Sequence, residues 1–143
     1  NYYSEKGLEG FENWFYLQAQ EERDHAMLIR TYLHNNDQKV KLFPIDVPEE
    51  TYKDYSAPLY KTLSHEKEVT ALIHNIFAAA HEDKDYRCIE FLNWFVKEQG
   101  EEEKNANDLI QKYELFGSDP KGLYLLDQEL KSRVYAPPSL VLD

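Results

Sequence analysis

The chain has 143 residues, a length that suits one domain built around a single hydrophobic core. Hydrophobic residues make up 42% of the chain and charged residues 30%, which excludes a disordered polypeptide. The formal net charge of −11 argues against nucleic acids and anionic membranes as partners and favours cations. The single cysteine, Cys88, excludes an internal disulfide and fits a reducing compartment, so we expect a cytoplasmic protein.

Apolar residues recur at three- and four-residue steps over most of the chain, which predicts long amphipathic helices. Gly117 and the following Asp119-Pro120 are typical of a helix end. Pro58 is tolerated only in the first turns of a helix, so the start of the second helix is its least defined boundary. The predicted helices are Leu8–Asn35, Asp54–Ala80, Tyr86–Phe116 and a short one, Gly122–Arg133.

The apolar stripes of the first two helices predict which of their residues lie in the core. In the first helix these are Phe11, Trp14, Phe15, Leu28, Ile29, Tyr32 and Leu33. In the second helix they are Leu59, Leu63, Val69, Ile73, Ile76 and Phe77.

The lengths of the connections predict how the long helices run. The short charged break Glu82–Asp85 makes the second and third helices antiparallel neighbours. The stretch between the first and second helices has about 18 residues and can reach about 60 Å, whereas a 28-residue helix is about 42 Å long. This connection can therefore travel the whole bundle and make the first two helices parallel.

The first and third predicted helices resemble each other. Phe11-Glu12-Asn13-Trp14-Phe15 matches Phe91-Leu92-Asn93-Trp94-Phe95, and Glu21-Glu22 matches Glu101-Glu102, at the same offset of 80 residues. Two helices that meet the same packing demand could also look alike. A true repeat of two helix pairs predicts a further long helix before Asn1, which the sequence does not contain.

Polar residues interrupt each apolar stripe near the middle of its helix. The interruptions are Gln18, Glu22 and His25 in the first helix, Glu66 in the second, and Glu98, Gln99 and Glu102 in the third. Mid-helix positions share one level of a bundle whether the helices run parallel or antiparallel. We therefore expect carboxylates from three helices to converge in the interior. Polar residues that interrupt the apolar stripes of several helices at the same height in a bundle indicate a functional site.

Converging carboxylates need a cation. Two like charges about 4 Å apart repel by about 4 kcal/mol at an effective dielectric constant near 20, and glutamate is rarely buried without a partner. Glu22 and His25 stand at i and i+3, the Glu-x-x-His arrangement of di-iron carboxylate bundles. Carboxylate and imidazole ligands without a thiolate favour iron or manganese. The run Glu101–Glu103 could instead be an ordinary solvated face, and this is the favoured interpretation of Glu103.

At these residues the chain resembles the prokaryotic non-haem ferritins. The resemblance covers nearly the whole chain, and its motifs are Glu21-Glu22-Arg23-Asp24-His25, Phe95-Val96-Lys97-Glu98-Gln99 and Gly122-Leu123-Tyr124, with 44 residues from Glu22 to Glu66 and 36 from Glu66 to Glu102. It implies that Glu22 bridges two irons, that His25 binds the first, and that Glu66 and Glu102 bind the second. It also implies that Gln99 lies beside the centre, and that Glu21, Glu98 and Glu101 form a third iron site.

Three departures refine the resemblance. Bacterioferritins and rubrerythrins repeat Glu-x-x-His, but here Asn105 follows Glu102 at that spacing. A bacterioferritin places a haem-ligating methionine where this chain has Arg23, so we expect iron and no haem. The family's first helix, with one glutamate ligand and a nearby tyrosine, does not lie within these 143 residues; it is either omitted from the sequence or removed from the protein. Its removal would impair the first iron site and uncover an apolar groove.

The resemblance implies an all-α fold over residues 1–143: a ferritin-like four-helix bundle with a long crossover, without its first long helix and with a short C-terminal helix. It implies an iron-storage subunit with ferroxidase activity, which oxidises Fe(II) with O2 or peroxide and deposits Fe(III) mineral in a 24-subunit homo-oligomeric cage. Two alternatives stay open. One is a structural ferritin-like subunit that binds metal without turnover, and the other is a di-iron or di-manganese oxidase of an organic substrate.

Overall fold

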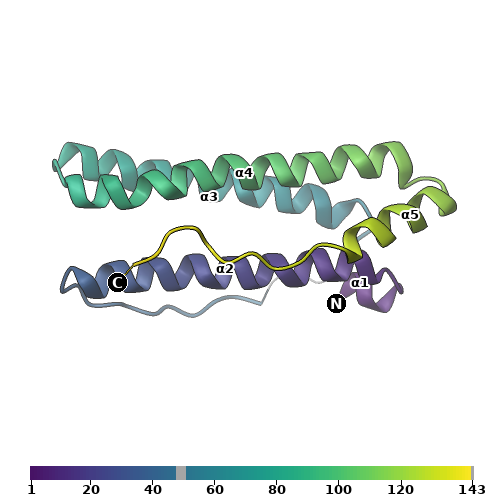
Figure 1. The fold of residues 1–143 in the computed structure, drawn as a ribbon, viewed down its shortest axis with the longest axis horizontal. Coiled ribbons are helices and arrows are strands. Elements are labelled where there is room, and N and C mark those ends of the chain that lie inside the picture. The colour runs from purple at the N-terminus through teal and green to yellow at the C-terminus, as the bar shows by residue number, and fades with distance from the viewer. Residues whose placement is uncertain (48–50, 143) are drawn as a thin grey trace. The chain divides into compact units, whose positions relative to one another are not determined.

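The computed structural model describes residues 1–47 and 51–142, and these form five α-helices and no strand (Figure 1). The helices are α1 (Tyr2–Glu5), α2 (Glu9–Asn35), α3 (Ala57–Glu82), α4 (Tyr86–Phe116) and α5 (Pro120–Lys131). No helix among the described residues is long and apolar enough to cross a membrane. The all-helical class is confirmed. Residues 48–50 of the predicted connection and Asp143 lie outside the described residues.

The chain divides into two compact units, which we describe separately. The α2 unit comprises Asn1–Thr51 and Lys121–Asp143, and so contains α1, α2 and nearly all of α5. The α3–α4 unit comprises Tyr52–Pro120. The predicted single domain over residues 1–143 stays a prediction.

The predicted helix boundaries are close to the observed ones. α4 has the predicted bounds, α2 begins one residue later than predicted, and α5 is shifted two residues toward the N-terminus. α3 begins at Ala57 rather than Asp54 because the side chain of Asp54 forms a turn that precedes the N-cap residue Ser56. The Oδ1 atom of Asp54 accepts hydrogen bonds from the backbone N–H groups of Ser56 and Ala57 at 3.0 and 2.9 Å. Pro58 then lies in the first turn of α3, where its missing N–H is tolerated.

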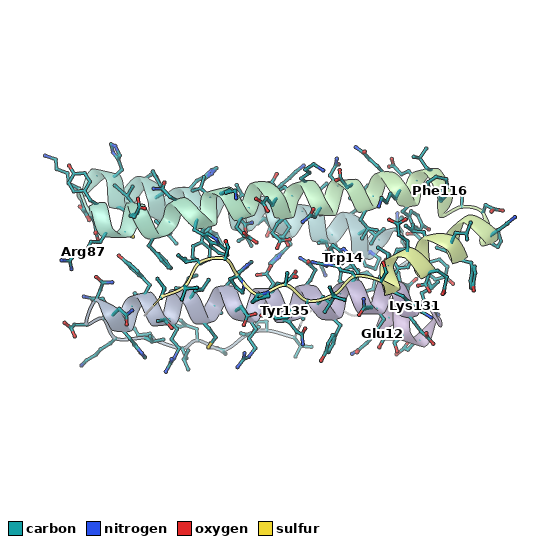
Figure 2. All side chains as sticks on the ribbon, viewed as in Figure 1. Glu12, Trp14, Arg87, Phe116, Lys131 and Tyr135 are labelled. Atoms are coloured by element: carbon teal, nitrogen blue, oxygen red, sulfur yellow. The ribbon has the colours of Figure 1, made fainter. Side chains whose placement is uncertain are left out.

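α3 and α4 form an antiparallel hairpin, as the short break between them predicts (Figure 1). The chain turns at Lys84, which has a left-handed φ of 56°. The side chain of Asp85 then accepts a hydrogen bond from the backbone N–H of Cys88 at 3.0 Å and caps α4. Figure 2 labels Arg87 and Phe116 at opposite ends of α4. The hairpin thus holds two long helices side by side over their middle turns.

α5 caps the start of α2. The N-cap position of α2 is Leu8, which has no side-chain oxygen to accept hydrogen bonds. The buried Oδ1 atom of Asp127 accepts from the backbone N–H groups of Gly10 and Phe11 at 2.7 and 3.1 Å. A Cβ atom at Gly10 would lie 1.7 Å from the backbone oxygen of Asp127, so only glycine allows this approach.

Two residues predicted for the core are exposed. The side chains of Ile29 and Ile76 keep 38% and 48% of their accessible surface. For these two residues the prediction is wrong, because helical spacing shows which face is apolar and not whether another element covers it. Phe11, Trp14, Leu59 and Ile73 are buried as expected.

We expect Asp127→Ala to lower the free energy of unfolding by about 1–3 kcal/mol, because two buried N–H groups lose their acceptor. Asp127→Asn should lose less, since the amide oxygen still accepts. The measurement is the urea midpoint followed by circular dichroism. Gln128→Ala, at an exposed neighbour on α5, is the control. Equal midpoints for Asp127→Ala and Gln128→Ala would contradict the capping role.

Candidate metal centre

Glu22 and His25 lie together on α2. The Nδ1 atom of His25 is 3.6 Å from the Oε2 atom of Glu22, one helical turn earlier. The imidazole is largely buried, whereas 45% of the Glu22 side-chain surface is exposed. An uninterrupted helix places both donors on one face because residues three apart are neighbours. The pair can therefore offer a carboxylate and a ring nitrogen to one metal ion.

Glu66 and Gln99 meet inside the α3–α4 hairpin. Both residues are buried, with 5% and 3% of their surface exposed. The Nε2 atom of Gln99 donates to the carbonyl oxygen and to the Oε2 atom of Glu66, each at 3.3 Å, and lies 3.5 Å from Oγ1 of Thr70. The amide thus orients the Glu66 carboxylate without adding a charge to it.

Glu98 and Glu102 lie one turn apart on the same face of α4. A carboxylate oxygen of Glu98 and one of Glu102 are within 4.8 Å of each other. Glu102 is buried and Glu98 is half-buried. Two carboxylates at this separation repel each other in a partly buried setting, and a cation bound to both relieves that repulsion.

The neighbouring acids of α4 differ in their surroundings. Glu101 is exposed and forms an ion pair with Lys97 at 3.3 Å, a type of contact that contributes little to stability. Glu103 is half-buried, and its Oε1 atom accepts a hydrogen bond of 2.6 Å from Thr70. Glu103 is therefore only partly solvated, and α3 supplies a hydroxyl partner for it.

Glu21 has a cationic partner that the sequence did not indicate. Its Oε2 atom lies 2.6 Å from a guanidinium nitrogen of Arg133, and the same nitrogen donates to Oε1 of Gln18 at 2.6 Å. Arg133 follows α5 and is 112 positions from Glu21. No periodicity or local spacing could have linked the two residues. Sequence reasoning also missed Thr70, whose hydroxyl lies between Gln99 and Glu103.

The donor atoms thus fall into two sets, one in each unit. Glu21, Glu22 and His25 belong to the α2 unit, and Glu66, Glu98, Gln99 and Glu102 belong to the α3–α4 unit, with Glu101 on an exposed face of α4. Apart from the amide of Gln99, the ligand-type groups in these two sets are carboxylates and the imidazole of His25. This chemistry fits iron or manganese better than it fits soft metals.

Similar proteins were found by family, by sequence and by structure. A family model described as "Ferritin-like domain" matches residues 1–116. A probable bacterial non-heme ferritin-like protein of Haemophilus influenzae is 34% identical over 126 residues, which cover 88% of this chain and 76% of that protein. A bacterial non-heme ferritin of Staphylococcus aureus is 35% identical over 134 residues, which cover 94% of this chain and 81% of that protein.

Two similar solved structures come from Archaeoglobus fulgidus. An engineered closed form of its ferritin gives a TM-score of 0.92 at 36% identity, covering 94% of this chain and 82% of that one. Its open-pore ferritin gives a TM-score of 0.90 at 36% identity, covering 92% of this chain and 82% of that one.

The family match extends over most of the chain, the relatives are aligned over most of their own length, and the five helices match the ferritin four-helix-bundle fold. The chain belongs to the ferritin family.

Proposed function

We propose that this protein is an iron-storage subunit with ferroxidase activity. The observation that carries the proposal is the burial of Glu66 and Glu102 on helix faces whose other buried residues, apart from Gln99, are apolar. Buried carboxylates are unfavourable unless a cation or a strong hydrogen-bonding partner is close. Membership of the ferritin family and the similarity to bacterial non-heme ferritins make Fe(II) the cation of choice.

Each donor has a distinct role in this proposal. Glu22 bridges two iron ions, and His25 binds the first of them through its imidazole. Glu66 and Glu102 bind the second iron, and Gln99 holds the Glu66 carboxylate in position. The protein supplies ligands, charge and orientation, whereas the electron transfer belongs to the iron.

Iron is the substrate of the reaction. Two Fe(II) ions each lose one electron and become Fe(III). With two protons from solvent, the two electrons convert O2 to hydrogen peroxide, or convert hydrogen peroxide to two water molecules. The carboxylates favour this change because their negative charge stabilises Fe(III) more than Fe(II). Fe(III) then leaves for mineral storage.

A third iron site would use Glu21, Glu98 and Glu101. The closeness of Glu98 to Glu102 supports a link between this site and the di-iron pair. The exposed ion pair of Glu101 with Lys97 is weak enough for a metal ion to displace the lysine. The alternative structural role would leave metal bound but without turnover.

Assembly as a 24-subunit cage completes the proposal. Similarity to the Archaeoglobus fulgidus ferritins supports it. Closed symmetric assemblies bury apolar surface that a monomer would expose. Tyr124 and Leu125 on α5 are exposed at 61% and 57%, and they are candidates for a subunit contact.

We expect Glu66→Ala to reduce the rate of aerobic Fe(II) oxidation to the rate of Fe(II) in buffer. Gln99→Leu should lower it by about 10–100-fold, as is typical when a residue that orients a metal ligand is removed. The measurement combines absorbance of Fe(III) with oxygen uptake at two Fe(II) per subunit. Glu68→Ala, an exposed acid two residues from Glu66, should react like the unmodified protein. Oxidation at the buffer rate by the unmodified protein would support the structural alternative.

Metal binding should also change stability in a characteristic way. Without metal, Glu66→Gln should unfold at the same temperature as the unmodified protein or higher, because the substitution removes a buried charge. Anaerobic Fe(II) at about 100 times its dissociation constant should stabilise the unmodified protein by about 2.7 kcal/mol per site, and this gain should shrink in Glu66→Gln. A metal-free loss of stability would instead indicate a structural role for the Glu66 carboxylate. Thermal unfolding followed by circular dichroism decides between the two.

The proposed cage predicts the molecular mass of the assembled protein. Because the chain has a mass of 17.0 kDa, a closed assembly of 24 copies should have a mass of roughly 400 kDa. Size-exclusion chromatography with light scattering measures it. Tyr124→Glu together with Leu125→Glu should shift the protein to smaller species. A monomer or dimer at micromolar concentration would rule out the cage, and it would leave the oxidation assay unaffected.

A further inference from the structure

We propose that Arg133 is a built-in competitor for cations at Glu21, so that its guanidinium and a metal ion cannot occupy that carboxylate together. The inference rests on the proposed function, which places Glu21 in a third iron site. It concerns one residue after α5 that no ferritin motif in this sequence includes. Arg133 would act as a positioning residue that sets the affinity of this site.

The guanidinium is seated by several contacts within the α2 unit. It donates to Glu21 and Gln18 at 2.6 Å each, and to the carbonyl oxygen of Trp14 at 3.3 Å. Its central carbon lies 5.2 Å from the centre of the Trp14 ring, a cation–π distance. The Arg133 side chain is 25% exposed and that of Glu21 is 14% exposed, so solvent screens the pair less than it screens a surface ion pair.

The backbone around Arg133 is held independently of this side chain. The Nδ2 atom of Asn13 donates to the carbonyl oxygens of Leu130 and Arg133 at 3.1 Å. The hydroxyl of Tyr135 donates to Oδ2 of Asp24 at 2.6 Å, and this carboxylate raises the pKa of the tyrosine. The C-terminal segment runs along α2, and Tyr135 and Trp14 are labelled on these two elements (Figures 1 and 2). The guanidinium can therefore leave Glu21 while the segment stays anchored at Asn13.

Charge makes the competition unavoidable. The guanidinium of Arg133 is a cation, as a metal ion is. Its positive charge lies within hydrogen-bonding distance of Glu21 and repels any second cation at the same carboxylate. By thermodynamic linkage, the factor by which the Arg133–Glu21 ion pair lowers the affinity for a metal ion equals the factor by which a bound metal ion weakens that ion pair.

The test uses terbium(III), a hard cation that prefers carboxylate oxygens and whose luminescence is sensitised by nearby aromatic residues. The difference in terbium binding between the unmodified protein and Glu21→Gln is the binding that depends on Glu21. For that part we expect Arg133→Gln to increase the affinity about fivefold, the effect of removing one partly screened charge. Glu21→Gln combined with Arg133→Gln should show no gain. A residue that only stabilised the fold would not raise metal affinity when it is removed.

Lys131→Gln is the matched control. It removes the same charge from the end of α5, where Lys131 pairs with Glu9 rather than with Glu21. Terbium affinity in this variant should stay within twofold of the unmodified protein. Equal affinities for Arg133→Gln, Lys131→Gln and the unmodified protein, or a lower affinity for Arg133→Gln, would overturn the inference.

A second measurement avoids dependence on a well-folded Arg133 variant. In the unmodified protein, saturating lanthanum(III), a diamagnetic ion of the same kind, should move the guanidinium NMR signals of Arg133 toward those of a solvent-exposed arginine, and it should not do so in Glu21→Gln. Unchanged guanidinium signals at saturation would reject the competition. Neither measurement requires iron turnover, so failure of the oxidation assay would reject the ferroxidase proposal separately.

Discussion

The burial of acidic side chains inside helix pairs is the constraint on which the rest of the molecule depends. A helix of 26 or 31 residues that packs along its length must present one continuous face to its neighbour. At Glu66, Gln99 and Glu102 that face is polar and nevertheless buried. Burial of a carboxylate is unfavourable by several kcal/mol in order of magnitude unless charge or hydrogen bonds compensate it. The fold therefore accepts a local loss of stability at the level where its chemistry would occur.

The negative charges of three carboxylates in this chain are balanced to different degrees. Glu101 is exposed and faces Lys97, so water and a mobile ammonium group share its charge. Glu21 is mostly buried and forms an ion pair with the guanidinium group of Arg133. Glu66 is the most buried, and the side-chain amide of Gln99 offers it a dipole rather than a full charge. Among these three carboxylates the cost of burial is greatest at Glu66, which is also a proposed iron ligand.

Helix periodicity was enough to predict α2, α3, α4 and α5, though not the four-residue α1, and to select Glu66, Gln99 and Glu102 as inward-facing. These are local properties, because residues three and four apart share a face in any straight helix. The pairing of Glu22 with His25 follows from the same rule, and the structure places the two side chains 3.6 Å apart. Periodicity wrongly predicted that Ile29 and Ile76 are buried, because whether an apolar face is covered depends on elements far away in the sequence.

The missed contacts that bear on α2 and its proposed ligands are long-range and involve polar groups. Asp127 caps α2 across 117 positions, and Arg133 reaches Glu21 across 112. Each is a single residue without a repeating pattern, so nothing in the local sequence distinguishes it from a surface residue. Both contacts nevertheless join the segment after α4 to α2, the helix that bears Glu22 and His25. A segment that follows the last long helix would therefore influence a proposed metal ligand near the middle of an earlier helix, because a cation bound at Glu21 would alter the electrostatic potential one residue away, at Glu22. The affinity of the proposed iron centre would then depend on the C-terminal segment as well as on its own ligands.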